Sequence, residues 1–397
     1  MRELGRQFVL GQTIEEAIEN ARPREKQGCV YSYDMLGEAA RTEADARRYH
    51  LAYSNAIGEL AKLCGADITR NPGVSVKLSA LHPRYEYPQR SRVIEELAPR
   101  LQSLALSAKS ANMGFNVDAE EADRLDLSLD VIEAVLSDPA LAGWDGFGIV
   151  VQAYGRCAGP VVDWLYALAR YLGRRIMVRL VKGAYWDSEI KRAQVLGLDG
   201  FPVFTRKANT DVSYLACVRK LLSMTDRLYP QFATHNAHSV AAILDMAENT
   251  AAFEFQRLHG MGEALHDAVL ERYGTRCRIY APVGAHRDLL AYLVRRLLEN
   301  GANSSFVNRI VDTNLAPADV ARDPIEVVER HDADAANPVI PCPSAIFGAA
   351  RKGARGRDIT DPAAMAELDA GREQFRAARW HAAPESAGRP VANEIRN

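Results

Sequence analysis

The sequence lacks the signatures that would assign it to several large classes of protein. Its six cysteines, among 397 residues, are scattered without a C-x-x-C pair or metal-like spacing, which argues against a disulfide framework and against a zinc site. Neither G-x-G-x-x-G nor G-x-x-x-x-G-K-[ST] occurs, so a Rossmann or P-loop nucleotide site is not expected. The sequence therefore predicts no metal centre and none of the common nucleotide motifs.

The charge is balanced, and the sequence has no long apolar segment. The 49 basic and 51 acidic residues are interspersed and give a net charge of −2, so no nucleic-acid partner is expected. The N-terminal stretch MRELGRQFVLGQTIEEA lacks the apolar run of a signal peptide. No segment reaches the roughly 18 apolar residues of a transmembrane helix. We expect a cytoplasmic protein whose contact with a membrane, if any, is peripheral.

The positive signal is a unit that recurs eight times: a short β-branched or aromatic run, a polar residue, and then a longer helical pattern. Alternating strands and helices imply parallel strands joined by right-handed crossovers, and eight such units favour a closed (βα)8 barrel, an α/β fold of the TIM type. The eight predicted strands are 30–35, 74–80, 114–119, 147–154, 175–183, 230–235, 253–260 and 277–284.

Three segments flank this repeat. A helix over about 5–27 precedes the first strand and is expected as an accessory outside the barrel. The last helix of the repeat, 286–301, carries leucines at i, i+4 spacing and ends at a glycine. After Ile310 the chain becomes rich in Pro, Gly, Ala and Arg, which indicates a surface-hugging extension with one helix near 362–378. We divide the chain into an N-terminal helical segment (1–29), the barrel (30–312) and a C-terminal extension (313–397).

Each predicted strand carries a polar residue near its carboxyl end, where barrels of this type place their active sites. Burying so many polar groups in one mouth is costly unless they pair or bind a ligand. The residues are Asp34 with Glu38, Lys77, Asp118, Gln152, Arg179 with Lys182, His235, Gln256 and Tyr280.

The last helix contributes an Arg295–Arg296 pair. Arginine holds a carboxylate through two parallel hydrogen bonds, so these residues together with Lys77 suggest a clamp for an anionic substrate. The alternative is an internal ion pair with Glu299, which lies one turn further along the helix.

The stretch 180–194, LVKGAYWDSEIKRAQ, has a glycine at the strand end, two large aromatics and a helix start at Asp187–Ser188. A glycine there lets a planar ligand approach the backbone, and Tyr185, Trp186 and Tyr280 offer flat apolar surface, although such aromatics often serve only as core packing. His235 and His238 at i, i+3 are only a weak indication of a metal site.

Long motifs then match a known family in order: VSVKLSALHPRY, NVDAEEADR, VQAYGR, VRLVKGAYWDSEIKRAQ, FATHNAH, FEFQRLHGMGE, RIYAPVG and LVRRLLENGANSSFVNRI. Over roughly residues 1–330 the chain resembles the proline dehydrogenase domain of the bacterial bifunctional proline utilization A flavoproteins. The resemblance implies a barrel whose last helix sits above the mouth, and a noncovalently bound FAD.

The resemblance also implies roles for individual residues. Arg295, Arg296 and Lys77 would clamp the carboxylate of L-proline, Tyr280, Tyr185 and Leu258 would enclose its ring, and Glu38 would pair with Arg295 as a gate. Arg179 would donate to the flavin N5 edge, and the Asp118 carboxylate near the substrate nitrogen would assist deprotonation of the amine. The residues implied in cofactor binding are Asp118, Ala119, Gln152, Arg179, Val181, Lys182, Gly183, Ala184, Trp186, Thr205, Arg206, Lys207, Thr234, His235, Gln256, Leu258, Tyr280, Arg296, Glu299 and Phe306.

The reaction implied by the resemblance is hydride transfer from proline C5 to flavin N5, giving Δ1-pyrroline-5-carboxylate, with a membrane quinone as the final acceptor. The aldehyde dehydrogenase domain of the bifunctional proteins is missing, and the chain ends abruptly at PVANEIRN, so we expect a truncated single-activity protein. Three alternatives stay open: a Schiff-base aldolase using Lys182 or Lys77, a folate-type flavin reductase, and a binding module without catalysis.

Overall fold

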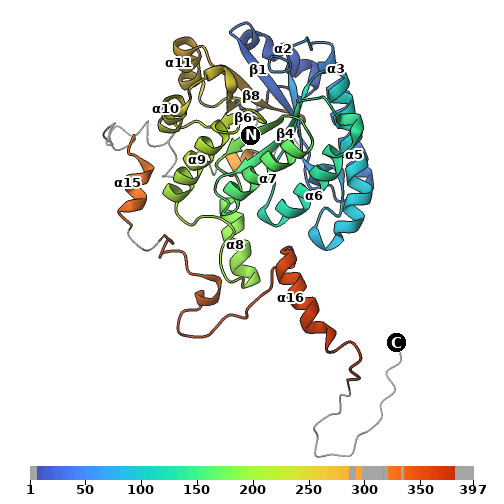
Figure 1. The fold of residues 1–397 in the computed structure, drawn as a ribbon, viewed down its shortest axis with the longest axis vertical. Helices are drawn as coiled ribbons and strands as arrows, with labels where there is room; N and C mark the ends of the chain where they lie inside the picture. The colour runs from blue at the N-terminus through green and yellow to red at the C-terminus, as the bar shows by residue number, and fades with distance from the viewer. Residues whose placement is uncertain (1–6, 286–291, 297–315, 317–320, 332–334, 381–397) are drawn as a thin grey trace, which may run out of the picture.

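The computed structural model describes residues 7–285, 292–296, 316, 321–331 and 335–380. Eight strands form a closed barrel in which every neighbouring pair is parallel and β8 returns to β1 (Figure 1). The predicted TIM-type fold is confirmed. The strands are β1 Cys29–Met35, β2 Gly73–Val76, β3 Gly114–Val117, β4 Phe147–Gln152, β5 Ile176–Val181, β6 Leu228–Ala233, β7 Glu254–Leu258 and β8 Arg276–Val283.

The alternation of side chains along β1 explains how a polar interior and an apolar shell coexist. Ser32 and Asp34 point into the barrel, where they contact Ser75 of β2 and Lys77 just after it. Tyr31 and Tyr33, between them in the sequence, are buried in the apolar layer beneath the helices. Successive strand residues face opposite sides of a sheet, so one short strand supplies both layers.

Helices follow the strands and bury apolar stripes against them. The helices between the strands are α3 Glu43–Ala61, α4 Leu78–Leu81, α5 Arg90–Ser110, α6 Leu125–Leu136, α7 Ala158–Tyr171, α8 Trp186–Leu196, α9 Lys207–Leu222, α10 Ala237–Met246 and α11 Glu263–Tyr273. Of the helix predicted at 286–301, residues 292–296 are described, and they lie over the barrel mouth because Tyr292 and Leu293 pack against Leu258 and Tyr280. The predicted position of this helix is confirmed for the described turn.

The N-terminal helix α2, Ile14–Glu25, lies outside the strands as expected, but it is built into the helical ring. Its chain leaves the mouth end of the barrel, where Gly11 pairs with Val283 at the end of β8, and runs back to the start of β1. Arg24 near its carboxyl end binds Glu263 and Asp267 of α11, and its other flank contacts α3. Thus α2 occupies the place in the ring between α11 and α3.

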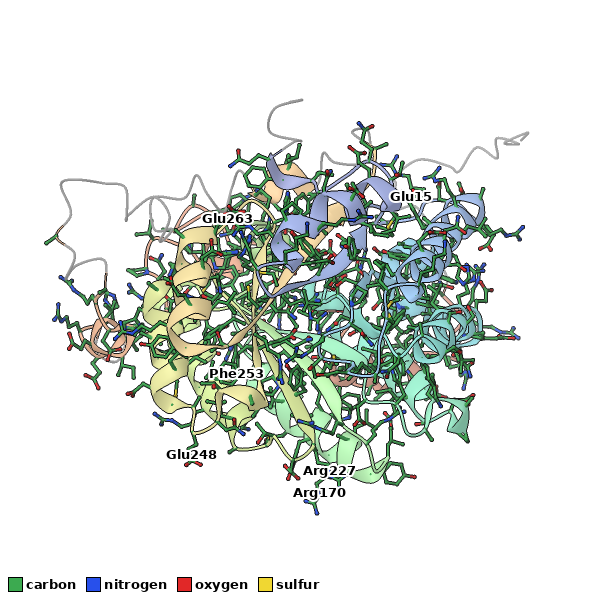
Figure 2. The ribbon with its side chains drawn as sticks, turned by 90° about the horizontal axis from the view of Figure 1, so that it is seen from above. Glu15, Arg170, Arg227, Glu248, Phe253 and Glu263 are labelled. Carbon is green, nitrogen blue, oxygen red and sulfur yellow. The ribbon has the colours of Figure 1, made fainter. Side chains whose placement is uncertain are left out.

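The view from above shows which end of the barrel is the mouth (Figure 2). Glu15 and Glu263 stand near the amino ends of α2 and α11, and both lie at one edge of the picture. Arg170 at the end of α7 and Arg227 just before β6 lie at the opposite edge, which is the base of the barrel. The edge with Glu15 and Glu263 is therefore the mouth, to which the strand carboxyl ends point.

Most predicted boundaries differ from the observed ones by a few residues, as three cases illustrate. β2 ends at Val76 because Lys77 precedes the short helix α4, whose Ser79 amide donates to Glu120. The helix predicted over about 5–27 is interrupted: residues 7–8 are helical, but at 9–13 the Leu10 amide donates to Pro282 of β8 and Thr13 caps α2, which begins at Ile14. α8 begins at Trp186, one residue before the predicted start.

The C-terminal part runs along one flank of the barrel (Figure 1). α15, Pro324–Glu329, packs against α9, and the segment 335–358, the strap, follows the surface of α8 and the start of α9. Helix α16, Pro362–Glu373, close to the predicted 362–378, buries none of its residues and lies apart from the barrel. Among the helices within the described ranges, none combines the length and apolarity needed to cross a bilayer.

The ring position of α2 predicts a stability effect at its inner face. Ala21 is fully buried there, so Ala21→Leu would overpack the interface and lower the free energy of unfolding by about 1–3 kcal/mol. Glu19→Ala, at an exposed site of the same helix, is the matched control and should change it by less than about 0.5 kcal/mol. Urea midpoints compare the two. Equal midpoints would mean that α2 is not part of the stable core.

Candidate active site

Four polar side chains from four strands or strand ends meet at the mouth. The ammonium of Lys77 donates to both carboxylate oxygens of Asp34, at 3.0 and 2.9 Å, and to Asp118 at 3.1 Å. The hydroxyl of Tyr280 lies 2.7 Å from Asp34 and 2.8 Å from Asp118, and 3.1 Å from the Lys77 ammonium. We call these four residues the mouth tetrad.

Within the mouth tetrad, the ammonium of Lys77 and the carboxylates stabilise each other's charged forms. Burial raises the pKa of the Asp34 carboxyl, and the Lys77 ammonium opposes that shift. Burial equally disfavours the charge on Lys77, but the carboxylates, Asp34 foremost, outweigh it and raise the pKa of the ammonium well above its usual value. Burial and the two carboxylates also raise the pKa of Tyr280, so its hydroxyl stays protonated. Lys77 is therefore a fixed cation.

Arg179 of β5 lies directly beneath the tetrad. Its Nη1 donates to Asp118 at 2.9 Å and its Nε to Gln256 at 2.6 Å, while Nη2 donates to the hydroxyls of Ser32 and Ser75. These bonds occupy four of the five guanidinium N–H groups. Only one Nη1 hydrogen has no acceptor among the described residues, and it is the one available to a ligand.

A second polar layer fills the barrel below Arg179. Glu254 of β7 and Arg278 of β8 form a buried ion pair at 2.7 Å. Gln256 and Gln231 donate to the same Glu254 oxygen, at 2.8 and 2.9 Å. At the base, Arg278 donates to the carbonyls of Asn71 and Thr69. The interior is thus a continuous chain of hydrogen bonds from the base to the mouth.

The described turn of the last helix covers the mouth. Arg295 makes two parallel hydrogen bonds to Glu38, both 2.8 Å, and its guanidinium lies 5.3 Å from the centre of the Tyr185 ring. Burial raises the pKa of Glu38, but the bonds from Arg295 outweigh burial and lower it. Arg296 is buried and lies over the ring of Tyr292. The expected pairing of Glu38 with Arg295 is present; Glu299, the alternative partner, lies outside the described residues.

The side of the mouth near β5 and α9 is cationic. Lys182 and Lys207 both bind Asp211 at 2.5 Å, and Arg206 donates to the carbonyl of Ala336 in the strap. Thr205 accepts a hydrogen bond from the amide of Asn337 in the same segment. Three cations face one carboxylate here, so the cluster retains a positive charge.

The remaining predicted residues line the rim between β3 and β7. Gln152 donates to the carbonyl of Glu120 and Trp186 to that of Phe204, both at 2.8 Å. His235 accepts from the Leu258 amide, and burial, helped by His266, lowers its pKa to about 3, so the ring is neutral. Thr234 is buried next to it. The other rim positions of the predicted set are Ala119, Val181 and Ala184.

Gly183 has a different reason to be glycine from the one the sequence suggested. Its φ is +134°, and a Cβ there would lie 2.4 Å from the Tyr154 ring. Packing within the protein therefore already excludes any larger residue. Phe306, also predicted in the site, lies outside the described residues.

Several residues of this interior are absent from the predicted set. The strand position of Asp34 predicts its place at the mouth but not its role, which is to bind both Lys77 and Tyr280. Ser32, Ser75, Glu254 and Arg278 were missed. The signal that could have found them is the period-2 pattern of polar residues inside apolar strands, as in Ser32–Asp34 and Glu254–Gln256.

This arrangement can be set beside known proteins. A family model described as "Proline dehydrogenase" matches residues 17–309, about three quarters of the chain. The chain belongs to the proline dehydrogenase family. It is 52% identical over 398 residues to the bifunctional protein PutA of Klebsiella aerogenes, covering 97% of this chain and 30% of that protein. Proline dehydrogenase 1 of Bacillus subtilis is 28% identical over 307 residues, which cover 76% of this chain and 88% of that enzyme.

Solved structures of the family agree with the barrel. A crystal structure of a variant of proline utilization A from Bradyrhizobium japonicum superposes with a TM-score of 0.88 at 54% identity, over 94% of this chain and 38% of that one. That of Bdellovibrio bacteriovorus, inactivated by N-propargylglycine, gives 0.79 at 32% identity, over 82% and 36%. The chain thus spans about a third of the length of its bifunctional relatives, and the predicted family and fold are confirmed.

The mouth tetrad predicts the outcome of removing its cation. Lys77→Met would leave two buried carboxylates with less compensation and lower the free energy of unfolding by about 3–5 kcal/mol at pH 8. Because Asp34 in its buried site would take up a proton more readily than in the unfolded chain, the loss should shrink as the pH falls to 5.

Chemical denaturation at the two pH values measures this effect. Lys62→Met, which removes an exposed lysine paired with Glu59, is the control and should cost less than about 1 kcal/mol at either pH. A loss for Lys77→Met that is small, or that grows on acidification, would contradict the charge assignment.

Proposed function

We propose that this chain is an FAD-dependent proline dehydrogenase unit that oxidises L-proline to Δ1-pyrroline-5-carboxylate, the first step in proline breakdown. The observation that carries the proposal is the mouth itself. In a barrel of the proline dehydrogenase family, the buried charge network at the mouth lies beneath a helical turn whose Arg295 is paired with Glu38. This set suits a small substrate with a carboxylate at one end and an oxidisable ring at the other.

The donor set fits a noncovalent flavin dinucleotide. The cluster of Lys182, Arg206 and Lys207 carries more positive than negative charge and suits a pyrophosphate, which such a dinucleotide bears. The unused N–H of Arg179 at the barrel centre suits an acceptor atom of the isoalloxazine edge. Bound FAD would supply the two-electron acceptor for the hydride leaving proline C5.

We assign the substrate carboxylate to Arg295 and Arg296. Both guanidinium groups lie on the helix that covers the mouth, and arginine binds a carboxylate in a bidentate manner. Lys77, the third predicted member of this clamp, uses its hydrogens on Asp34, Asp118 and Tyr280. Its part is therefore to hold these groups and to contribute positive potential, and Arg295 must exchange Glu38 for the substrate.

The proline ring would lie against Tyr280, Tyr185 and Leu258. Tyr280 and Leu258 border the apolar cluster formed with Tyr292 and Leu293, which excludes water from this side. The carboxylate of Asp118 accepts three hydrogen bonds, from Lys77, Tyr280 and Arg179. We therefore give Asp118 an orienting role for these groups, in preference to that of a base for the substrate amine.

The final electron acceptor would be a membrane quinone, which the protein would reach from the cytoplasm by peripheral contact. Residues 30–312 would form the catalytic barrel, with the helical segment before it and the extension 313–397 behind it. Of the alternatives, the aldolase is disfavoured at Lys77, since a lysine held as a cation by two carboxylates is a poor nucleophile.

A spectroscopic experiment tests the proposal. The purified protein should be yellow, and anaerobic L-proline should bleach its flavin absorbance while NADH should not. Bleaching by NADH alone would indicate a reductase, and a colourless protein trapped on a keto substrate by borohydride would indicate an aldolase. D-proline, which presents its ring with the opposite hand, is the control substrate and should bleach the flavin far more slowly.

The clamp assignment predicts a separate effect on substrate binding. Arg295→Met should raise the KM for L-proline about 100-fold, since a charge-assisted bidentate contact is worth roughly 3 kcal/mol. The rate of flavin reduction by pyrrolidine, which lacks the carboxylate, should change less than about threefold. Steady-state assays with both substrates measure this. A similar loss for both would show that Arg295 acts on the ring or the fold and not on the carboxylate.

A further inference from the structure

Beneath the proposed active site, Glu254 is buried at 1% exposure and touches no residue of the mouth tetrad directly. Its Oε1 accepts hydrogen bonds from Gln231, Gln256 and Arg278, and its Oε2 accepts a second one from Arg278. A carboxylate with four hydrogen bonds in a barrel interior is firmly held. Glu254 in turn holds the side-chain amide of Gln256.

The orientation of that amide follows from its two neighbours. Gln256 Nε2 lies 2.8 Å from Glu254 Oε1, and Gln256 Oε1 lies 2.6 Å from Arg179 Nε. A carboxylate only accepts and a guanidinium only donates, so the amide has one satisfactory orientation. Glu254 thereby turns the Gln256 carbonyl toward Arg179.

The Gln256 carbonyl is the only acceptor of the Arg179 Nε–H among the described residues. Asp118 and the two serine hydroxyls hold the opposite side of the guanidinium. Contacts on both sides fix the plane of the group, and with it the direction of the one N–H for which the described residues offer no acceptor. If the amide turned over, its NH2 would face Nε–H, donor against donor, and the guanidinium would have to move.

We propose that Glu254 is a positioning residue for the oxidation chemistry, acting through Gln256 to aim Arg179 at the flavin. The inference rests on the proposed function, since it requires a flavin at the mouth. Arg179 at the flavin edge stabilises the additional negative charge of the reduced cofactor. Glu254 should therefore control the reduction potential of the flavin from a position that neither substrate nor cofactor contacts.

The sign of the effect separates this role from simple electrostatics. Removal of a nearby negative charge makes electron uptake easier, so the charge alone would make Glu254→Gln raise the flavin midpoint potential. If the Arg179 guanidinium loses its orientation, the reduced flavin loses a stabilising contact. The positioning role therefore predicts a lower flavin midpoint potential. Glu254→Asp keeps the charge but shortens the side chain, so it should also lower the flavin midpoint potential.

The experiment uses the whole FAD-loaded protein. Glu254→Gln and Glu254→Asp are expected to lower the midpoint potential in a dye-coupled reductive titration, and to weaken sulfite binding at flavin N5 about tenfold, as for loss of one charged hydrogen bond. The rate constant for flavin reduction by proline should fall about tenfold, with KM changed less than about twofold. In a Gln256→Met background, a further Glu254→Gln change should add nothing.

Gln231→Met is the matched control. It removes a hydrogen bond to the same Glu254 oxygen from the side away from Gln256, and should reduce thermal stability without a shift in potential. An unchanged or raised potential in folded, yellow Glu254 variants, additivity with Gln256→Met, or failure of both Glu254 variants to fold would overturn the positioning role. A wild-type protein that is not bleached by proline would instead overturn the proposed function.

Discussion

The pairing of charges inside the barrel is the constraint on which the rest of this structure depends. Three cations, Lys77, Arg179 and Arg278, share the interior with the carboxylates of Asp34, Asp118 and Glu254. An unpaired charge buried in the barrel would cost several kcal/mol of folding free energy. Removal of any one of these residues therefore leaves the charges of its partners uncompensated. The strands must therefore keep their mutual register, because a slip of one residue would turn these groups into the apolar layer.

This balance also bears on how the mouth would bind the proposed charged substrate. The tetrad and Arg179 satisfy one another, and one guanidinium N–H has no acceptor within the part of the chain that the structure describes. Arg295 is held by Glu38 at the edge of the site, where its side chain is partly exposed. Exchange of the Glu38 carboxylate for that of the proposed substrate would preserve the charge there.

Helix α2 completes the helical ring because the outer faces of β8 and β1 need an apolar cover. The described turn of the last helix, residues 292–296, packs at the mouth and not on the outer faces of β8 and β1. Those faces are apolar, and α2 shields them with Ile14, Ala17 and Ala21. The strap uses backbone groups against Thr205 and Arg206, so that flank of the proposed cofactor site is bordered by chain far away in the sequence.

The sequence by itself determined the eight strands, the parallel barrel and most of the polar residues at its mouth, because apolar periodicity and strand-end polarity are local properties. The family motifs added the pairing of Glu38 with Arg295, which the structure confirms. Only the tertiary structure decided that the Lys77 ammonium donates to Asp34, Asp118 and Tyr280. It likewise decided that Glu254 is linked to Arg179 through the side-chain amide of Gln256. Hydrogen bonds across the barrel join strands up to some 250 residues apart, and no local pattern specifies which donor meets which acceptor.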